Sequence, residues 1–343
     1  MPFIPASTDK LKFAYTFTLG LDPLPPLSPK TRSLWSVTSA FQNNVLRLKR
    51  MMLAPAFIGD LANRIQRYTD IAEFEVTGTV HKARFPPDEQ GDKIFERMKA
   101  LLKEDTAQVT SEVGNEERLL GIVRDAVETG GSSAVMLASS PPQSIGFEAL
   151  LLSYITSMWT AFETLAGDLW ESAINEKPNL LAQLKGKSNR LRKGRRADGF
   201  SSARTDRDED TSKSVRLDLI QFYQWNLSNK MGTVLKRKYE FSRLESIREA
   251  YASAFCEKAD NIDKILSDDA LDVVSALRNV IVHKGAVADK EYLARCKHLP
   301  KLPHAGEGQE VPLDGEIVSS AIGEAIYCSA HLIGAVDEWI TAH

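Results

Sequence analysis

Two long segments with apolar side chains at every third or fourth position most constrain the fold of this chain. In the segment at 147–175, FEALLLSYITSMWTAFETLAGDLWESAIN, the stripe is Leu151, Ile155, Met158, Phe162, Leu165 and Leu169. In the segment at 314–343, the stripe is Val318, Ile322, Ala325, Leu332, Val336 and Trp339. This spacing gathers side chains on one face of an α-helix. Stripes of this kind are typical of core helices, so we expect two long helices that bury them.

The remaining segments favour a mainly α fold in two parts. From Thr31 a third stripe follows, made of Leu34, Val37, Phe41, Val45 and Leu48. The prolines near residue 25 predict an extended arm before it, and the alternating residues 72–85 predict a short strand. Because 131–144 is rich in Gly, Ser and Pro, we expect a linker there. It separates a mainly helical region of unknown role at 1–130 from a helical domain at 145–343.

Residues 185–213 form an insertion in the second part, and they are nearly free of large apolar side chains. Such a segment cannot contribute to a core. The formal net charge of the chain is −3, so contact with a nucleic acid requires a local basic patch. Two interpretations stay open: a solvated loop, or an arm that binds the phosphate backbone of RNA. The RNA-binding candidates are the cations at its start, Lys185, Lys187, Arg190, Arg192, Lys193, Arg195 and Arg196.

The segment RNVIVHKG at 278–285 places three polar side chains at the end of an apolar helical stretch. Gly285 fits a left-handed helix cap, and Lys284 suits the carbonyl end of a helix. Asn279 and His283 are four residues apart and share a face. Arg278 and His283 are five apart, about 140° around a regular helix. We therefore expect these two to converge only across a groove, at a frayed helix end or through a second copy of the chain.

The chemistry of these residues fits metal-free cleavage of RNA. A histidine can take the proton from the ribose 2′-hydroxyl, and an arginine can stabilise the charge on the phosphorane. This reaction needs no cofactor. A second group, CKHLPKLPH, holds Cys296, His298 and His304 but lacks a fourth ligand at a typical spacing, so we expect no metal site there.

The segment ALRNVIVHKGAVADKEYL resembles the signature of the HEPN superfamily, an arginine followed after four to six residues by a histidine. Arg278, Asn279 and His283 match it, with a polar residue directly after the arginine. Gly285 and Asp289 also resemble residues that follow the histidine in some members. The segment WTAFETLAGDLW is similar to the first long helix of the RiboL-PSP-HEPN groups, in which an acidic or polar residue lies where Glu163 stands.

The resemblance covers roughly residues 145–343 and implies a helical bundle that forms a homodimer with two motifs facing across a cleft. It implies a metal-independent endoribonuclease that leaves 2′,3′-cyclic phosphate ends, in bacterial antiviral defence or a toxin–antitoxin system, with RNA and an antitoxin or regulatory protein as partners. The catalytic candidates are Arg278 on the phosphate, His283 as acid and base, Asn279 as orienting residue, and Glu163. Some members are inactive, so the alternative is a non-catalytic RNA-binding or protein-interaction module.

The expected location is the cytoplasm. Cys256, Cys296 and Cys328 lie far apart in the chain, which favours a reducing compartment over a disulfide framework. The first residues lack the basic and then apolar order of a signal peptide. No run of 18 apolar residues occurs, so we expect no membrane span.

Overall fold

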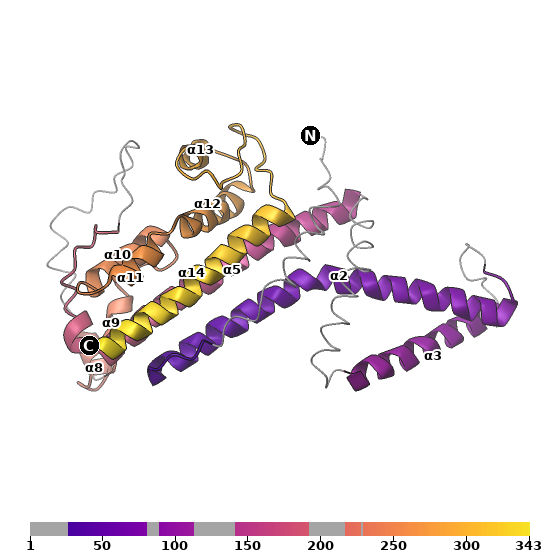
Figure 1. The fold of residues 1–343 in the computed structure, drawn as a ribbon, viewed down its shortest axis with the longest axis horizontal. Coiled ribbons are helices and arrows are strands. Elements are labelled where there is room, and N and C mark those ends of the chain that lie inside the picture. The colour runs from indigo at the N-terminus through magenta and orange to yellow at the C-terminus, as the bar shows by residue number, and fades with distance from the viewer. Residues whose placement is uncertain (1–26, 81–88, 113–140, 192–216, 228) are drawn as a thin grey trace. The chain divides into compact units, whose positions relative to one another are not determined.

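The mainly α fold is confirmed. The computed structural model describes residues 27–80, 89–112, 141–191, 217–227 and 229–343, and for 55, 56, 108–112 and 141–148 it describes the backbone alone. Within these ranges there is no strand beyond the isolated bridge between Val287 and Glu310. The helices are η1 (Arg32–Leu34), α2 (Trp35–Thr77), α3 (Glu89–Glu112), α5 (Pro141–Glu176), α6 (Pro178–Leu181), α8 (Leu217–Phe222), α9 (Met231–Lys236), α10 (Leu244–Ala254), α11 (Asp260–Leu266), α12 (Asp269–Lys284), α13 (Lys290–Cys296) and α14 (Gly315–Ala342) (Figure 1).

The chain forms two compact units. The described parts of the first are residues 49–80, 89–112, 141–151 and 314–316. Those of the second are residues 27–48, 152–191, 217–227, 229–313 and 317–343. The predicted arm before residue 27 and the predicted linker at 131–140 lie outside the described residues, and 141–144 begin α5.

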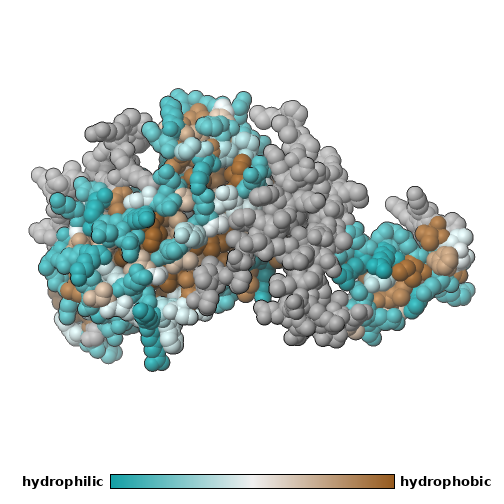
Figure 2. All heavy atoms as spheres, in the orientation of Figure 1, coloured by the Kyte–Doolittle hydropathy of each residue, from teal (hydrophilic) through white to brown (hydrophobic). Residues whose placement is uncertain are grey.

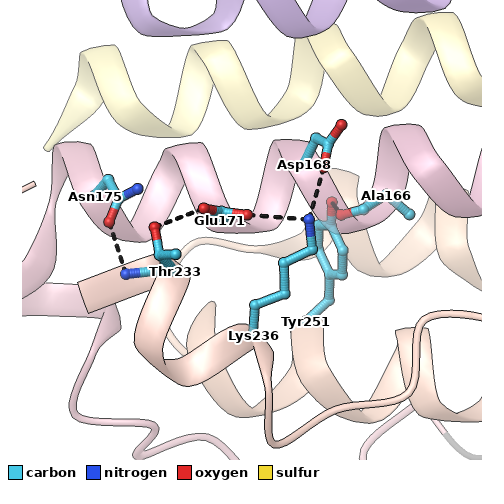
Figure 3. A network of polar contacts seen from close by, with 8 residues as sticks. Ala166, Asp168, Glu171, Asn175, Thr233, Lys236 and Tyr251 are labelled. Atoms are coloured by element: carbon cyan, nitrogen blue, oxygen red, sulfur yellow. Dashed lines mark hydrogen bonds and ion pairs between the residues drawn. The ribbon is translucent and has the colours of Figure 1, made fainter. Parts of the chain in front are cut away.

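The core of the second unit contains the predicted apolar stripes apart from Leu151, which belongs to the first unit. All the stripe residues of α5 and α14 are buried, and so are those that begin at Leu34. Within this unit α14 runs alongside α5, and the first turns of α2 run alongside α14 (Figures 1 and 3). Asp337 on α14 accepts hydrogen bonds from the backbone N–H groups of Lys30 and Thr31, both at 2.8 Å. The start of α2 is thereby fastened to the last helix.

The first unit contains a helical hairpin of α2 and α3. Its core consists of Ala72, Ile94 and Met98, with Val76 packed against it. The strand predicted at 72–85 is wrong up to Val80, because α2 continues to Thr77 and 78–80 form no strand, and 81–85 lie outside the described residues. Ala72 and Val76 lie four apart, so a helix turns both toward α3, whereas the alternation that suggested a strand is local. Apolar side chains also lie on the hairpin surface, among them Phe74 at 60% exposure (Figure 2).

Capping residues define the ends of α12, the helix that carries the RNVIVH segment. The Asp268 carboxylate accepts the N–H of Ala270, and Gly285 ends the helix in the left-handed conformation at φ 59°. The helix-end interpretation of HKG is therefore confirmed. The buried Arg248 of α10 holds α12 from the side through two hydrogen bonds to the Asp272 carboxylate, at 2.8 and 2.9 Å.

The loop after α12 is also held in place. The backbone N–H of Ala288 donates to Gln309 O, and that of Val311 donates to Ala286 O, both at 2.8 Å. Asp289 caps α13 by accepting the N–H of Tyr292. The residues that follow His283 thus pair with the segment near 309.

Among the described helices, α14 is long and apolar enough to cross a membrane by length and composition, which the expectation of no membrane span did not anticipate. Its most apolar window has a mean hydropathy of 1.3, and 56% of that window is buried inside the protein. Core helices meet the same two criteria, and the buried stripe of α14 fits a core helix.

Candidate active site

The end of α12 presents the polar residues of the RNVIVH segment at the surface of the second unit. Leu277 and Val280 are buried, whereas Arg278 and Asn279 are half-buried and His283 is exposed. Val280 therefore packs the core, and the polar positions remain available for chemistry.

The Arg278 guanidinium joins the other two polar residues. Its Nη1 lies 3.1 Å from Asn279 Oδ1 and 3.3 Å from His283 Nε2. We expected these two residues to converge only across a groove, at a frayed helix end or through a second copy, and their side chains meet within one chain at the last turn of α12. The two residues are separated by roughly one and a half turns, and the long arginine side chain spans this interval along the helix surface.

The contact assigns a role to each nitrogen. A guanidinium has N–H donors and no acceptor, so His283 Nε2 must accept the hydrogen bond. A hydrogen bond in this geometry requires the neutral tautomer with a lone pair on Nε2, which is the form of a general base. Asn279 Oδ1 accepts from the same guanidinium nitrogen, which suits a residue that orients the arginine.

Glu163, on α5, lies near enough to Arg278 for the two charges to interact. Burial raises the pKa of the Glu163 carboxyl, while the Arg278 charge and the Trp159 indole act in the opposite direction. Glu163 Oε2 and Trp159 Nε1 are both buried, and neither has a hydrogen-bond partner among the described residues. A buried carboxylate is costly without compensation, and the charge of Arg278 offsets only part of that cost. The fold thus brings all four catalytic candidates into one neighbourhood.

This neighbourhood combines a base, a cation and a carboxylate at an exposed helix end. The histidine can remove a proton from a hydroxyl, and the planar guanidinium can bind two oxygens of one phosphate. The Asn279 amide oxygen accepts a hydrogen bond from the guanidinium, and the Glu163 carboxylate interacts with the charge of Arg278. An anionic ester with a neighbouring hydroxyl is the substrate that this set suits.

The basic arm is only partly described. Lys185 and Lys187 are exposed. Arg190 is occupied by the protein itself: it donates to Ala252 O at 3.3 Å and to Phe255 O at 2.6 Å, and it forms an ion pair with Asp263 at 2.7 Å. Arg190 therefore binds the end of α10. The remaining candidates, Arg192, Lys193, Arg195 and Arg196, lie outside the described residues.

A second polar network, which sequence reasoning missed, joins α9 to α5 (Figure 3). Lys236 Nζ lies 2.6 Å from Asp168 Oδ1 and 3.0 Å from Glu171 Oε2, and Thr233 donates to Glu171 at 2.6 Å. Burial alone lowers the Lys236 pKa, but the two carboxylates outweigh burial and raise it. The sequence feature that could have predicted this network is the spacing of Asp168, Glu171 and Asn175, which places them on one face of α5. Because its groups pair with one another, the network serves packing.

The segment with Cys296, His298 and His304 does not assemble its three side chains. Cys296 is buried, with Sγ 3.8 Å from Pro303 O, and burial raises the pKa of its thiol. Both histidines are exposed. Within the described ranges, no three His, Cys, Asp or Glu side chains lie close enough together to hold a metal ion.

Comparison of the chain with protein-family models, with curated proteins and with solved structures found no match. The HEPN resemblance therefore rests on the residues that carry it. What the chain does has to be inferred from the chemistry of Glu163, Arg278, Asn279 and His283.

Proposed function

We propose that this chain is a metal-independent endoribonuclease that cleaves RNA to 2′,3′-cyclic phosphate and 5′-hydroxyl ends. The observation that supports it best is the 3.3 Å contact between Arg278 Nη1 and His283 Nε2 at an exposed helix end. A base and a cation this close together match the adjacent 2′-hydroxyl and phosphate of a single nucleotide.

The resting contact must open before the reaction begins. Arg278 occupies the lone pair of His283 Nε2, so the imidazole is blocked while the two remain paired. A phosphate group draws the guanidinium to itself, because a charge-assisted hydrogen bond is stronger than one to a neutral imidazole. Binding of the substrate thereby frees the base next to the 2′-hydroxyl.

The chemical step is a displacement at phosphorus. His283 Nε2 takes the 2′-hydroxyl proton, the 2′-oxygen bonds to phosphorus, and Arg278 stabilises the charge on the non-bridging oxygens. The bond to the 5′-oxygen then breaks, and this oxygen receives a proton from an imidazolium. Attacking and leaving oxygens lie roughly in line on opposite sides of phosphorus, so the proposal assigns the donation of that proton to His283 of a second copy.

The test compares two exposed histidines of the second unit, His283 and His298. In the full chain, His283→Ala should lower the rate of RNA cleavage at least about 100-fold, as expected for loss of an acid–base group. His298→Ala should leave the rate unchanged, and EDTA should have no effect on the wild type. The products are analysed for 2′,3′-cyclic phosphate ends. Equal cleavage by both variants would assign the activity to a contaminant, and wild-type protein that binds RNA without cleaving it would favour the non-catalytic module.

A further inference from the structure

One buried indole of α5 lacks the hydrogen bond that two other buried tryptophans make. Trp170 Nε1 donates to Ala250 O at 2.9 Å, and Trp339 Nε1 donates to Glu257 O at 2.7 Å. Trp159 is 2% exposed, yet its Nε1 has no hydrogen-bond partner among the described residues. A buried indole N–H usually has a partner, because leaving it unpaired destabilises the fold. Packing alone does not account for the unpaired N–H of Trp159.

The neighbour of this indole is the carboxylate of the candidate active site. Trp159 and Glu163 lie four residues apart on α5, so the helix turns both side chains to the same face. Burial raises the pKa of the Glu163 carboxyl, while the Arg278 charge and the Trp159 indole act in the opposite direction. Glu163 Oε2 is itself buried without a hydrogen-bond partner among the described residues. An unpaired donor and an unpaired acceptor thus share one face of α5, within reach of the Arg278 charge.

We propose that Trp159 is a positioning residue, whose indole N–H binds the Glu163 carboxylate when Arg278 turns to the phosphate of the substrate, an inference that rests on the proposed function. In the free protein, Arg278 compensates part of the Glu163 charge. A phosphate that draws the guanidinium to itself removes part of this compensation, and a buried carboxylate without it is costly. A hydrogen bond from the indole to the ionised carboxylate replaces what is lost.

The alternation of partners gives Trp159 a role in catalysis without contact to the substrate. Because Trp159 receives Glu163, Arg278 can move from His283 to the phosphate without leaving a buried charge unpaired. The indole therefore stabilises the state in which the base is free and the cation lies on the phosphate.

The first test observes the indole protons and does not depend on cleavage. In protein with isotope-labelled tryptophan, each indole N–H gives a cross-peak in a nitrogen–proton correlation spectrum, and Trp159→Phe identifies the peak of Trp159. Arg278→Ala should move the Trp159 indole proton downfield, because the Glu163 carboxylate then turns to the indole. Glu163→Gln in the same background should reverse most of that shift. The Trp170 peak should stay in place, since its indole already donates to Ala250 O. A Trp159 proton that does not move in Arg278→Ala would overturn the proposal.

The second test measures RNA cleavage. Trp159→Phe should lower kcat/KM about tenfold, as expected for one lost hydrogen bond to a charged group. Most of the loss should lie in kcat, because the hydrogen bond forms only after the substrate binds. Trp170→Phe removes the same volume from the same helix and is the matched control.

The control variant should separate positioning from packing. Trp170→Phe should lower the melting temperature at least as much as Trp159→Phe, because it also leaves Ala250 O without its donor. It should nevertheless keep the wild-type rate of cleavage. Equal losses of cleavage in the two variants would show that Trp159 acts through packing and would overturn its positioning role.

The two tests together distinguish this inference from the proposed function. Wild-type cleavage together with an unmoved Trp159 proton defeats the positioning role alone. A proton that moves as expected, in a chain that leaves RNA intact, defeats the ribonuclease and leaves the pairing of Trp159 with Glu163 standing.

Discussion

The half-buried carboxylate of Glu163 destabilises the folded state when it is ionised. It is half-buried on α5, its Oε2 has no hydrogen-bond partner among the described residues, and burial raises the pKa of the carboxyl despite the charge of Arg278. A group whose pKa is higher in the folded state than in the unfolded state stabilises the fold below its unfolded pKa. That stabilisation is lost as the pH rises through the folded pKa. At neutral pH, ionised Glu163 therefore costs stability.

Glu163→Gln should raise the free energy of unfolding at pH 7 while it impairs RNA cleavage, because glutamine keeps the shape but cannot hold the Arg278 charge. The gain in stability should shrink as the pH falls toward the unfolded pKa of a glutamate, about 4.3. Urea unfolding at pH 7 and at pH 4.5, together with the cleavage assay, measures both effects. If Glu163→Gln were less stable than the wild type at pH 7, the claim that ionised Glu163 destabilises the fold would be wrong.

The cations of the basic arm differ in role. Arg190→Ala removes hydrogen bonds to Phe255 O and Ala252 O and the Asp263 ion pair, so it should cost about 1–3 kcal/mol of stability. Lys185→Ala with Lys187→Ala should leave stability unchanged, because both side chains are exposed. If the arm binds RNA, the double variant should reduce the slope of log affinity against log salt by up to about 1.4. An unchanged slope would return this part of the arm to the solvated-loop interpretation.

At the scale of elements, α9 packs against α5 so closely at Gly232 that no side chain fits between the two backbones. The backbone N–H of Gly232 on α9 donates to Asn175 Oδ1 on α5 at 2.7 Å. A Cβ atom at Gly232 would lie far inside the van der Waals distance of Glu171 O, a backbone atom that cannot swing aside. Glycine is therefore required for α9 to approach α5 closely enough to form the network of Figure 3.

Gly232→Ala should destabilise the protein by about 1–3 kcal/mol, the usual range for an overpacked contact. Gly334 on α14 is the matched control, since a Cβ there has open space. Gly334→Ala should stabilise the protein by about 0.5–1 kcal/mol, because alanine loses less backbone entropy in a helix. The melting temperature should fall for Gly232→Ala and rise for Gly334→Ala. Equal changes in the two melting temperatures would contradict a close approach of α9 to α5.

At the scale of the whole molecule, the ribonuclease proposal requires two copies of the chain. Displacement at phosphorus requires a base on the side of the attacking oxygen and an acid on the side of the leaving oxygen. A single His283 side chain cannot reach both sides at once. Val282, next to His283, is 50% exposed, and Val287 beyond the helix cap is 38% exposed. Apolar side chains that flank a polar motif suit a face that a second copy covers.

Light scattering of the full chain at micromolar concentration should show a homodimer through residues 145–343. Val282→Glu should convert it to a monomer and abolish cleavage, because the carboxylate would be buried without a partner. Leu180→Glu, at an apolar position of α6 that is 47% exposed, should leave the dimer intact. A wild-type monomer with full ribonuclease activity would defeat the two-copy mechanism and leave the one-chain site in place.

The sequence by itself determined the long helices that carry the three apolar stripes, their buried faces and the end of α12. These properties depend on residues three or four apart and on local caps, such as Asp268 and Gly285. The position of the RNVIVH segment followed from the same local rules. Its side chains were identified by residue type, because charge and acid–base chemistry belong to the residue whatever the fold.

Only the tertiary structure decided which distant residues meet. Arg190 binds Phe255 across 65 residues, and Asp337 binds Thr31 across 306. The helix at 72–77 formed because Ala72 and Val76 pack toward α3, which the local alternation of residues does not encode. The burial of Glu163 beside Arg278 likewise depends on how α5 and α12 are packed together. Periodicity specifies which face of a helix is apolar, but the partner of that face is set by the free energy of packing the whole chain.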